Sequence, residues 1–291
     1  MSEEDDDSQT TSTIDEEELK ILNKKGYQLE SKPFNKGSFA TVFRGQHSGT
    51  TLAIKMIDCE KVSDNYKNKF LPRELFVLKK LKHRFIIAKR EILTVNNKVF
   101  IIMEFAEGGD LFDYINSKGR LEESIAKPLL RQISEALDYI HSETIAHRDL
   151  KCENILLNES KTIAKLTDFG FARTCYDNKS GDRLLSETKC GSLAYVGPEL
   201  LKGKPFDPIP HDCWSIGVVL YTMTLGKTPF SPKLQPKQLL DKHLTKTYEL
   251  VDTRISDDCK DIISRLLEPN VKTRLNTKQI LSHQWIKNIK V

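Results

Sequence analysis

The chain has 291 residues, of which 38% are hydrophobic, and this is enough to form a large core in one domain or in two lobes. Its six cysteines form no C-x-x-C pair, so the sequence favours neither a disulfide framework nor a zinc knuckle. No apolar run approaches the roughly 20 residues that a membrane span needs, and the acidic start differs from a secretory signal. We therefore expect a cytoplasmic protein that does not associate with membranes.

The formal net charge of +4 hides an uneven distribution of charge along the chain. Residues 1–18 hold nine acidic residues and no basic one, so the rest of the chain carries 45 basic against 41 − 9 = 32 acidic residues. The basic residues are dispersed rather than clustered with aromatic ones, which argues against nucleic acid as the partner and suits ATP or another anion. The acidic segment has little apolar surface to bury, and we expect residues 1–26 to form a disordered tail.

From Tyr27 onward, β-type residues alternate with turn formers, which predicts an antiparallel sheet. Residues 35–42 can be compared with the G-x-G-x-x-G-x-V loop that covers nucleotide phosphates, where Gly37 matches the middle glycine. Asn35 and Ala40 stand at the outer glycine positions. Asn tolerates left-handed backbone and Ala adds only a methyl group, so the loop can still approach phosphates closely. An ordinary hairpin turn is the alternative.

A lysine, Lys55, ends the next predicted strand, thirteen residues after Val42. At that position its charge can meet the α- and β-phosphates of a nucleotide. The helix expected over residues 64–81 carries Glu74 among apolar side chains, so this carboxylate needs a buried cation. We predict that Lys55 pairs with Glu74, although either one alone could be an ordinary surface residue.

Residues 91–95 and 98–103 are expected to form two strands joined by a tight turn. The segment that follows, 104–106, is expected to connect two lobes and to hold adenine through its main chain, with Met103 either at the rear of the pocket or simply in the core. Asp110 is either a helix N-cap or a ribose contact. A long helix is predicted over residues 122–142, where Pro128 could kink the helix or delay its start.

Residues 147–154 read His-Arg-Asp-Leu-Lys-Cys-Glu-Asn and lie between two apolar runs. Asp149 and Asn154 have the spacing with which a loop can aim a carboxylate at a substrate hydroxyl and an amide at a magnesium ion. Asp168-Phe169-Gly170 follows fourteen residues after Asn154, again behind a strand-like segment. The pattern indicates phosphoryl transfer, and the competing interpretation is a polar surface turn.

The polar segment from residue 174 to residue 189 has the composition of a mobile loop and contains Ser186 and Thr188. A phosphate on this loop could bind Arg148, although Thr188 could equally be a surface residue without a regulatory role. Farther along, Asp212 is expected to cap main-chain amides of residues 147–154. We also expect a buried structural ion pair between Glu199 and Arg274.

Taken in order, these motifs resemble the eukaryotic protein kinases over residues 27–286. Several short motifs are more specifically similar to those of the testis-specific serine/threonine kinases, which belong to the calcium/calmodulin- and AMP-kinase-like branch. These motifs lie at residues 25–27, 69–74, 109–111, 151–154, 168–171, 190–195 and 281–283. The resemblance implies an α+β, bilobal fold. It places a small antiparallel N-lobe with one main helix at 27–103, a hinge at 104–107, a larger mainly helical C-lobe at 108–286, and a C-terminal end at 287–291.

The same resemblance implies ATP and Mg²⁺ as cofactors and assigns roles to individual residues. Asp149, Lys151 and Asn154 would be catalytic, Asn154 and Asp168 would hold the metal, and Thr188 and Arg148 would be regulatory. The ATP site would be formed by Asn35, Lys36, Gly37, Ser38, Phe39, Ala40, Val42, Ala53, Lys55, Glu74, Met103, Glu104, Ala106, Asp110, Leu156 and Asp168.

The function implied is a monomeric protein serine/threonine kinase with a role in spermatid differentiation, an upstream activating kinase and a chaperone partner. Glu153 and Asp110 match family positions that favour a basic residue before the target, so we expect basic-directed substrates. Two rival hypotheses remain. A pseudokinase scaffold would account for Asn35, Ala40 and Gly197, which depart from the family pattern, and a nucleic-acid-binding module rests on the basic charge alone.

Overall fold

The computed structural model describes residues 14–37, 39–177, 180–187 and 190–289. They form two compact units, one made of the residues up to 69 together with 89–105, the other of 70–88 together with the residues from 106 onward. The first unit is built on a sheet and the second is mainly helical, which confirms the predicted α+β class. Among the helices that the structure describes, none is long and apolar enough to cross a membrane.

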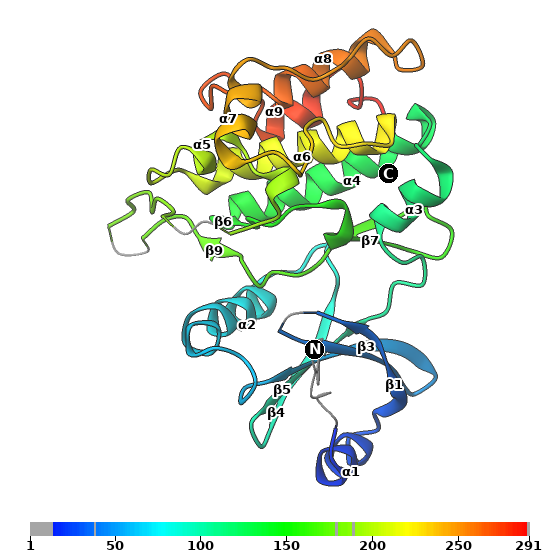
Figure 1. Cartoon of the computed structure of the whole chain (residues 1–291). Coiled ribbons are helices and arrows are strands. Elements are labelled where there is room, and N and C mark those ends of the chain that lie inside the picture. The colour runs from blue at the N-terminus through cyan, green and yellow to red at the C-terminus, as the bar shows by residue number, and fades with distance from the viewer. Residues whose placement is uncertain (1–13, 38, 178–179, 188–189, 290–291) are drawn as a thin grey trace, which may run out of the picture. The chain divides into compact units, whose positions relative to one another are not determined.

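The first unit is a five-stranded antiparallel sheet in the order β1-β2-β3-β5-β4 (Figure 1). Along β3 the residues Leu52, Ile54 and Met56 are buried on one face, whereas Ala53 and Lys55 lie on the other, as the period of two in a strand requires. The strands are β1 (Gln28–Lys36), β2 (Thr41–His47), β3 (Thr50–Asp58), β4 (Lys89–Val95) and β5 (Lys98–Glu104).

A helix, α1 (Glu16–Lys24), precedes the sheet, so the expected disordered tail over 1–26 is wrong for this part of the chain. Asp15 and Glu18 form a capping box, and the acidic residues of the first turn suit the positive end of the helix dipole. The acidic composition that argued against folding therefore stabilises the helix start. Residues 1–13 lie outside the described residues.

Long-range contacts fasten α1 to the sheet. Leu22 is fully buried in a core that includes Ile54 and Phe100. Glu18, only 1% exposed, pairs with Lys98 of β5 at 2.9 Å between the carboxylate oxygen and Nζ. A buried carboxylate without a partner of opposite charge is strongly destabilising, so the pair of Glu18 with Lys98 favours this position of the helix. The helix thus covers one face of the sheet and forms part of its core.

Replacing Leu22 by alanine is expected to lower the free energy of unfolding of the first unit by about 2–5 kcal/mol, because a buried side chain leaves a cavity. The matched control is Leu244→Ala, since the Leu244 side chain is 49% exposed and should contribute little. Urea denaturation of both variants beside the wild type makes the comparison. Equal midpoints for the two variants would show that α1 does not belong to the core.

The second unit is organised around two long helices, α4 (Glu123–Ser142) and α6 (Pro208–Leu225), which pack against each other (Figure 1). The structure continues α4 through Pro128 from Glu123, so the proline does not delay the helix start. Helix α6 begins at Pro208 and is buried along almost its whole length, and Asp212 lies inside it rather than at its start. The remaining helices are α2 (Leu71–Lys80), α3 (Leu111–Lys118), α5 (Pro198–Leu201), α7 (Pro236–Leu244), α8 (Asp257–Leu266) and α9 (Thr277–Ser282).

Two short antiparallel pairs, β6 (Ile145–Ala146) with β9 (Arg173–Thr174) and β7 (Ile155–Leu157) with β8 (Ala164–Leu166), frame the chain between these helices. Brief helical turns occur at η1 (Tyr66–Phe70), η2 (Cys152–Asn154) and η3 (Leu193–Tyr195). The loop over residues 147–154 therefore begins at β6 and ends at β7, and both of its ends are fixed by strands.

Helix α2 was expected in the N-lobe, but the structure groups it with the second unit. The reason is the segment that follows it. Ile87 N–H donates to the Leu166 carbonyl at 2.9 Å, and Leu166 N–H donates to the Phe85 carbonyl at 2.9 Å. His83 also stacks on Tyr139 of α4, with ring centroids 5.1 Å apart. Residues 82–88 are thus bound to β8 and α4. Because α2 directly precedes them, it belongs to the second unit as well.

Candidate active site

The loop over residues 147–154 is held by hydrogen bonds within its own sequence. Asn154 Nδ2 donates to the Asp149 carbonyl at 2.8 Å and to its carboxylate at 3.1 Å. Both side chains are largely buried, so these bonds keep a single orientation. The donor end of the Asn154 amide is engaged with Asp149, and the acceptor end, Oδ1, is the atom that a cation would take.

Lys151 and Ser192 complete the surroundings of the Asp149 carboxylate. Ser192 donates to Asp149 Oδ1 through its main-chain N–H at 3.0 Å and its hydroxyl at 3.3 Å. Lys151 Nζ lies 3.4 Å from the carboxylate and donates to the Ser192 hydroxyl at 3.1 Å. The three residues place a carboxylate and an ammonium group side by side, as proton acceptance and charge neutralisation require.

The carboxylate of Asp212 binds the main chain of the loop over residues 147–154. It accepts hydrogen bonds from the main-chain N–H groups of His147 and Arg148, both at 2.8 Å, and from the ring Nε2 of His141 at 2.9 Å. Burial alone would raise the pKa of Asp212, but the hydrogen bond and charge of His141 outweigh it and the pKa is lowered. The expected capping role of Asp212 is confirmed. His141 was not anticipated, because one histidine on a helix carries no sequence signal of this contact.

Asp168 follows β8 and is joined to the loop through the residue before it. Thr167 N–H donates to the Asn154 carbonyl at 3.0 Å. Asp168 has a φ of 59°, in the left-handed region, and its side chain is exposed. Phe169 is buried with its ring centroid 5.1 Å from that of His147. The structure therefore brings Asp168 and Asn154 onto adjacent, hydrogen-bonded segments.

Asn154 and Asp168 supply the two kinds of oxygen donor, amide and carboxylate, that suit Mg²⁺. The described residues contain no group of three or more His, Cys, Asp or Glu placed to hold a metal ion. Two protein ligands fit magnesium nonetheless, since this ion commonly keeps several waters and takes phosphate oxygens in nucleotide sites. The residues present are compatible with the expected cofactor.

Three arginines, Arg73, Arg148 and Arg173, lie close enough to interact at the loop over residues 147–154, which we call the catalytic loop. Burial lowers the pKa of Arg148, and the charges of Arg173 and Arg73 lower it further. Arg148 Nη2 donates to Cys190 Sγ at 2.9 Å. The described part of the neighbouring segment carries Ser186, which is buried and exchanges main-chain hydrogen bonds with Phe206. Thr188 lies outside the described residues.

Gly191 is required by the approach of its segment to the catalytic loop. Its φ is 102°, and a Cβ at this position would lie 2.9 Å from the Arg148 carbonyl oxygen. A side chain would therefore be strained and would also collide with main chain that cannot yield. The main-chain N–H of the next residue, Ser192, thereby reaches Asp149.

The expected ion pair between Glu199 and Arg274 is confirmed. Arg274 donates to the two carboxylate oxygens of Glu199 at 2.8 and 2.9 Å in a bidentate arrangement, and both side chains are largely buried. Burial would raise the pKa of Glu199, but hydrogen bonds from His211 and Arg274 outweigh it and hold the pKa far below its usual range. Gly197, the departure from the family pattern, lies against this pair.

The residues predicted for ATP are divided between the two units. Asn35, Lys36, Gly37, Phe39, Ala40, Val42, Ala53, Lys55, Met103 and Glu104 belong to the first unit, whereas Glu74, Ala106, Asp110, Leu156 and Asp168 belong to the second. Within the first unit, Val42 pairs with Lys55, and Ala53 with Met103, across neighbouring strands. Ser38 lies outside the described residues. The pairing of Lys55 with Glu74 remains a prediction.

Two further positions of the second unit are placed by its local structure. Asp110 is the N-cap of α3 and accepts the Asp113 N–H at 2.8 Å, which agrees with one of its two proposed roles. It also forms an isolated bridge with Leu156 of β7. Glu74 is 1% exposed, and its carboxylate lies 3.6 Å from the position that a Cβ on Gly170 would take. Glu74 thus lies next to the Asp168-Phe169-Gly170 motif.

Removing the Asp212 carboxylate should weaken the whole loop. Asp212→Ala leaves two buried N–H groups without their acceptor, and we expect a loss of about 3 kcal/mol in the free energy of unfolding. Asp212→Asn retains an acceptor oxygen and should lose less. Urea denaturation at pH 7 measures both variants.

The difference in free energy of unfolding between the wild type and Asp212→Asn should also depend on pH. The pKa of Asp212 is lowered in the folded protein from its ordinary value of 3.8, so its stabilisation is present above about pH 4 and is lost as the pH falls further. The advantage of the wild type over Asp212→Asn should therefore shrink below pH 4. A constant difference from pH 7 to pH 3 would contradict this role of the carboxylate.

Comparison with known proteins shows extensive similarity. Residues 30–286 match the model of a family described as protein kinase domain. The chain is 39% identical over 269 residues to testis-specific serine/threonine-protein kinase 2 of Mus musculus, covering 91% of this chain and 75% of the relative. It is 41% identical over 270 residues to testis-specific serine/threonine-protein kinase 3 of Mus musculus, covering 91% and 98%. It is 35% identical over 266 residues to an SNF-related serine/threonine-protein kinase of Homo sapiens, covering 90% and 34%.

Proposed function

The chain belongs to the protein kinase family and is a serine/threonine-protein kinase, and from this premise we propose that it transfers the γ-phosphate of ATP to protein hydroxyls through Asp149, Lys151, Asn154 and Asp168. The observation that carries the proposal is the Asp149 carboxylate, which Asn154 and Ser192 orient while Lys151 lies 3.4 Å away. The resemblance inferred from the motifs is confirmed by the comparisons.

In this mechanism Asp149 accepts the proton of the substrate hydroxyl while the hydroxyl oxygen forms a bond to the γ-phosphorus of ATP. The bond from this phosphorus to the β–γ bridging oxygen breaks, and ADP leaves. Two hydrogen bonds from Ser192 and one from Asn154 fix the carboxylate, so little reorganisation is needed during the reaction. Lys151 stabilises the charge of the phosphoryl group in transit. Positioning and charge stabilisation, rather than a covalent intermediate, lower the barrier.

ATP would be held by the residues that the family resemblance assigns to it. Lys55 would bind the α- and β-phosphates, and the turn between β1 and β2 would cover them. Asn154 and Asp168 would hold Mg²⁺, which neutralises phosphate charge when bound. Glu74 would orient Lys55, a role that rests on the family resemblance alone.

Asp149→Asn is expected to reduce phosphate transfer by about a thousandfold or more, because an amide cannot accept the proton. Transfer of radiolabelled phosphate from ATP to a basic serine peptide measures it. Asp168→Ala should be equally inactive through loss of a magnesium ligand. The control is Asp257→Asn, since the Asp257 side chain is 98% exposed and lies on α8. Full activity of either active-site variant, with a folded wild type as reference, would reject the assignment.

We further propose that the substrates carry a basic residue a few positions before the target. Glu153 lies in η2, which contacts α3, and Asp110 is the N-cap of α3, so two carboxylates lie on neighbouring elements beside the catalytic loop. Glu153 is exposed and accepts a hydrogen bond from the Tyr195 hydroxyl at 3.4 Å. An exposed carboxylate held in this way can bind a guanidinium group of a substrate.

Glu153→Gln should raise KM about tenfold for a peptide with an upstream arginine, because a charge-assisted hydrogen bond is lost. For the same peptide with alanine in place of arginine, KM should not respond to the variant. Glu159→Gln, on the exposed turn between β7 and β8, serves as the matched control. If both peptides lose affinity equally, Glu153 acts through the loop and not through the arginine.

A phosphate on Thr188, added by an upstream kinase, is proposed to activate the enzyme. Support comes from Arg148 and Arg73, because burial and then the charge of Arg173 lower the pKa of both. Such a cluster needs an anion to relieve its repulsion. Arg148 also contacts Cys190, two residues from Thr188 along the chain. The phosphate would draw this segment towards the catalytic loop.

The cellular setting is proposed from the relatives and from the thiols. The testis-specific names of the similar kinases support a role in spermatogenesis or spermatid differentiation. A chaperone partner and a monomeric state are proposed from the family resemblance alone. All six cysteines are free, which suits a reducing compartment such as the cytoplasm.

A further inference from the structure

The turn between β1 and β2 makes an aromatic contact that its sequence does not announce. Gly37 N–H donates to the Ala40 carbonyl at 2.8 Å and closes the turn. The Phe39 ring leaves this turn and stacks on Tyr66, with centroids 4.4 Å apart and ring planes 12° from parallel. Near-parallel rings at this distance form a favourable stacked pair. A residue of the predicted phosphate loop is therefore attached to a distant part of the first unit.

Tyr66 is a fixed platform for this contact. Its side chain belongs to a residue only 6% exposed, whereas Phe39 is 42% exposed. Tyr66 N–H donates to the Ser63 hydroxyl at 3.2 Å, and Lys67 N–H donates to the Ser63 carbonyl at 2.9 Å. Tyr66 thus begins the turn η1 with its backbone anchored on both sides. Since the buried ring cannot follow the turn, the stack restrains Phe39.

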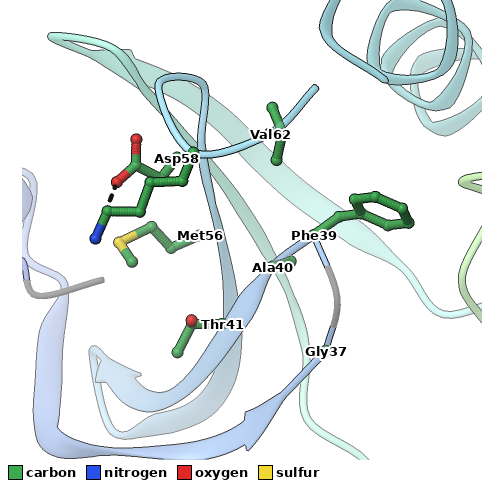
Figure 2. Close-up of a pocket in the computed structure, with 8 residues that line it drawn as sticks. Gly37, Phe39, Ala40, Thr41, Met56, Asp58 and Val62 are labelled. Carbon is green, nitrogen blue, oxygen red and sulfur yellow. Dashed lines mark ion pairs between the residues drawn. The ribbon is translucent and has the colours of Figure 1, made fainter. Parts of the chain in front are cut away.

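The other side of the turn is not packed. A hollow of about 330 Å³, open to solvent, lies between the turn and the end of β3. It is lined by Gly37, Phe39, Ala40, Thr41, Met56, Asp58, Lys61 and Val62. Figure 2 shows the Phe39 ring turned away from Met56, Thr41 and Asp58. The turn has room to move on this side, so the stack with Tyr66 adds a restraint to those given by the pairing of β1 with β2 and the hydrogen bond between Gly37 and Ala40.

We propose that Tyr66 is a positioning residue, which holds the turn between β1 and β2 in place through Phe39 and so increases the affinity for nucleotide. This rests on the proposed function, in which the turn covers the phosphates of ATP. A turn that is already held in place loses less conformational freedom when it binds the nucleotide. Because Tyr66 influences the turn through Phe39, its loss should affect nucleotide affinity and leave the chemical step unchanged.

The test is the variant Tyr66→Leu, with Tyr66→Phe as the conservative variant that retains the ring. Tyr66→Leu should raise KM for ATP about fivefold with kcat within about twofold of the wild type, the range expected when one aromatic stack is lost. Tyr66→Phe should retain the wild-type KM. The dissociation constant of a fluorescent ADP analogue with Mg²⁺ should change in the same way.

A double-mutant cycle assigns the effect to the contact. In a Phe39→Leu background, Tyr66→Leu should cause no further loss, because the stack is already absent. Phe76→Leu, which removes a half-exposed ring from α2, is the matched control and should leave nucleotide binding unchanged. If Tyr66→Leu fails to fold, the comparison of Tyr66→Phe with Phe39→Leu still tests the proposal, because the first should retain the wild-type KM and the second should raise it.

Three results would overturn the proposal: an unchanged KM in Tyr66→Leu, an equal loss in Tyr66→Phe, or additive losses in the cycle. Failure of the proposed function appears differently. A wild type that binds the ADP analogue but transfers no phosphate contradicts the kinase mechanism, while the binding constants of the variants still decide the role of Tyr66.

Discussion

The buried carboxylate of Asp212 is the interaction on which the active site depends. A charged group inside the core is costly unless it is fully paired, and here two main-chain amides of the catalytic loop and the ring of His141 supply the partners. Because α6 is buried along its length, Asp212 cannot move without disturbing the core of the second unit. The core of the second unit therefore fixes the position of this loop, and Asp149 follows directly after the two residues, His147 and Arg148, that Asp212 binds. Burial that would otherwise destabilise the fold thus becomes a means of fixing the site.

Much of this site could be predicted from the sequence, because its residues are close along the chain or recur at set spacings. Asp149, Asn154 and Asp168 form such a pattern, and the pairing of Glu199 with Arg274 follows from the need of a buried carboxylate for a partner. Helix α1 was missed for the opposite reason. Its composition is that of a disordered tail, and the contacts of Leu22 and Glu18 that stabilise it come from strands far along the sequence. The stack of Phe39 on Tyr66 has no local signal either, since neither residue is unusual in its own segment.

The departures from the family pattern acquire a physical explanation in one case. At Gly197 an alanine Cβ would lie 2.5 Å from the carboxylate of Glu199 as it stands, and that carboxylate is fixed by Arg274 and lies 3.4 Å from His211. Glycine and this placement of Glu199 therefore belong together, and the change from alanine says nothing against catalysis. Asn35 differs, because nothing in the structure explains why it stands where the family has glycine. The case for a catalytically inactive scaffold is weakened at Gly197 and rests on the phosphate loop alone.

Helix α1 extends the folded first unit to residues that precede the family match. The family match starts at residue 30, so a chain cut at that boundary would lack the helix, as well as Tyr27 and Lys25, which both contact Glu91. The face of the sheet that carries Ile54, Met56 and Phe100 would then meet water, and Lys98 would lose its carboxylate partner Glu18. Exposed apolar sheet surface of this kind promotes association between chains. A protein shortened to the conserved family limits would accordingly be prone to aggregate, although every residue assigned to phosphate transfer would still be present.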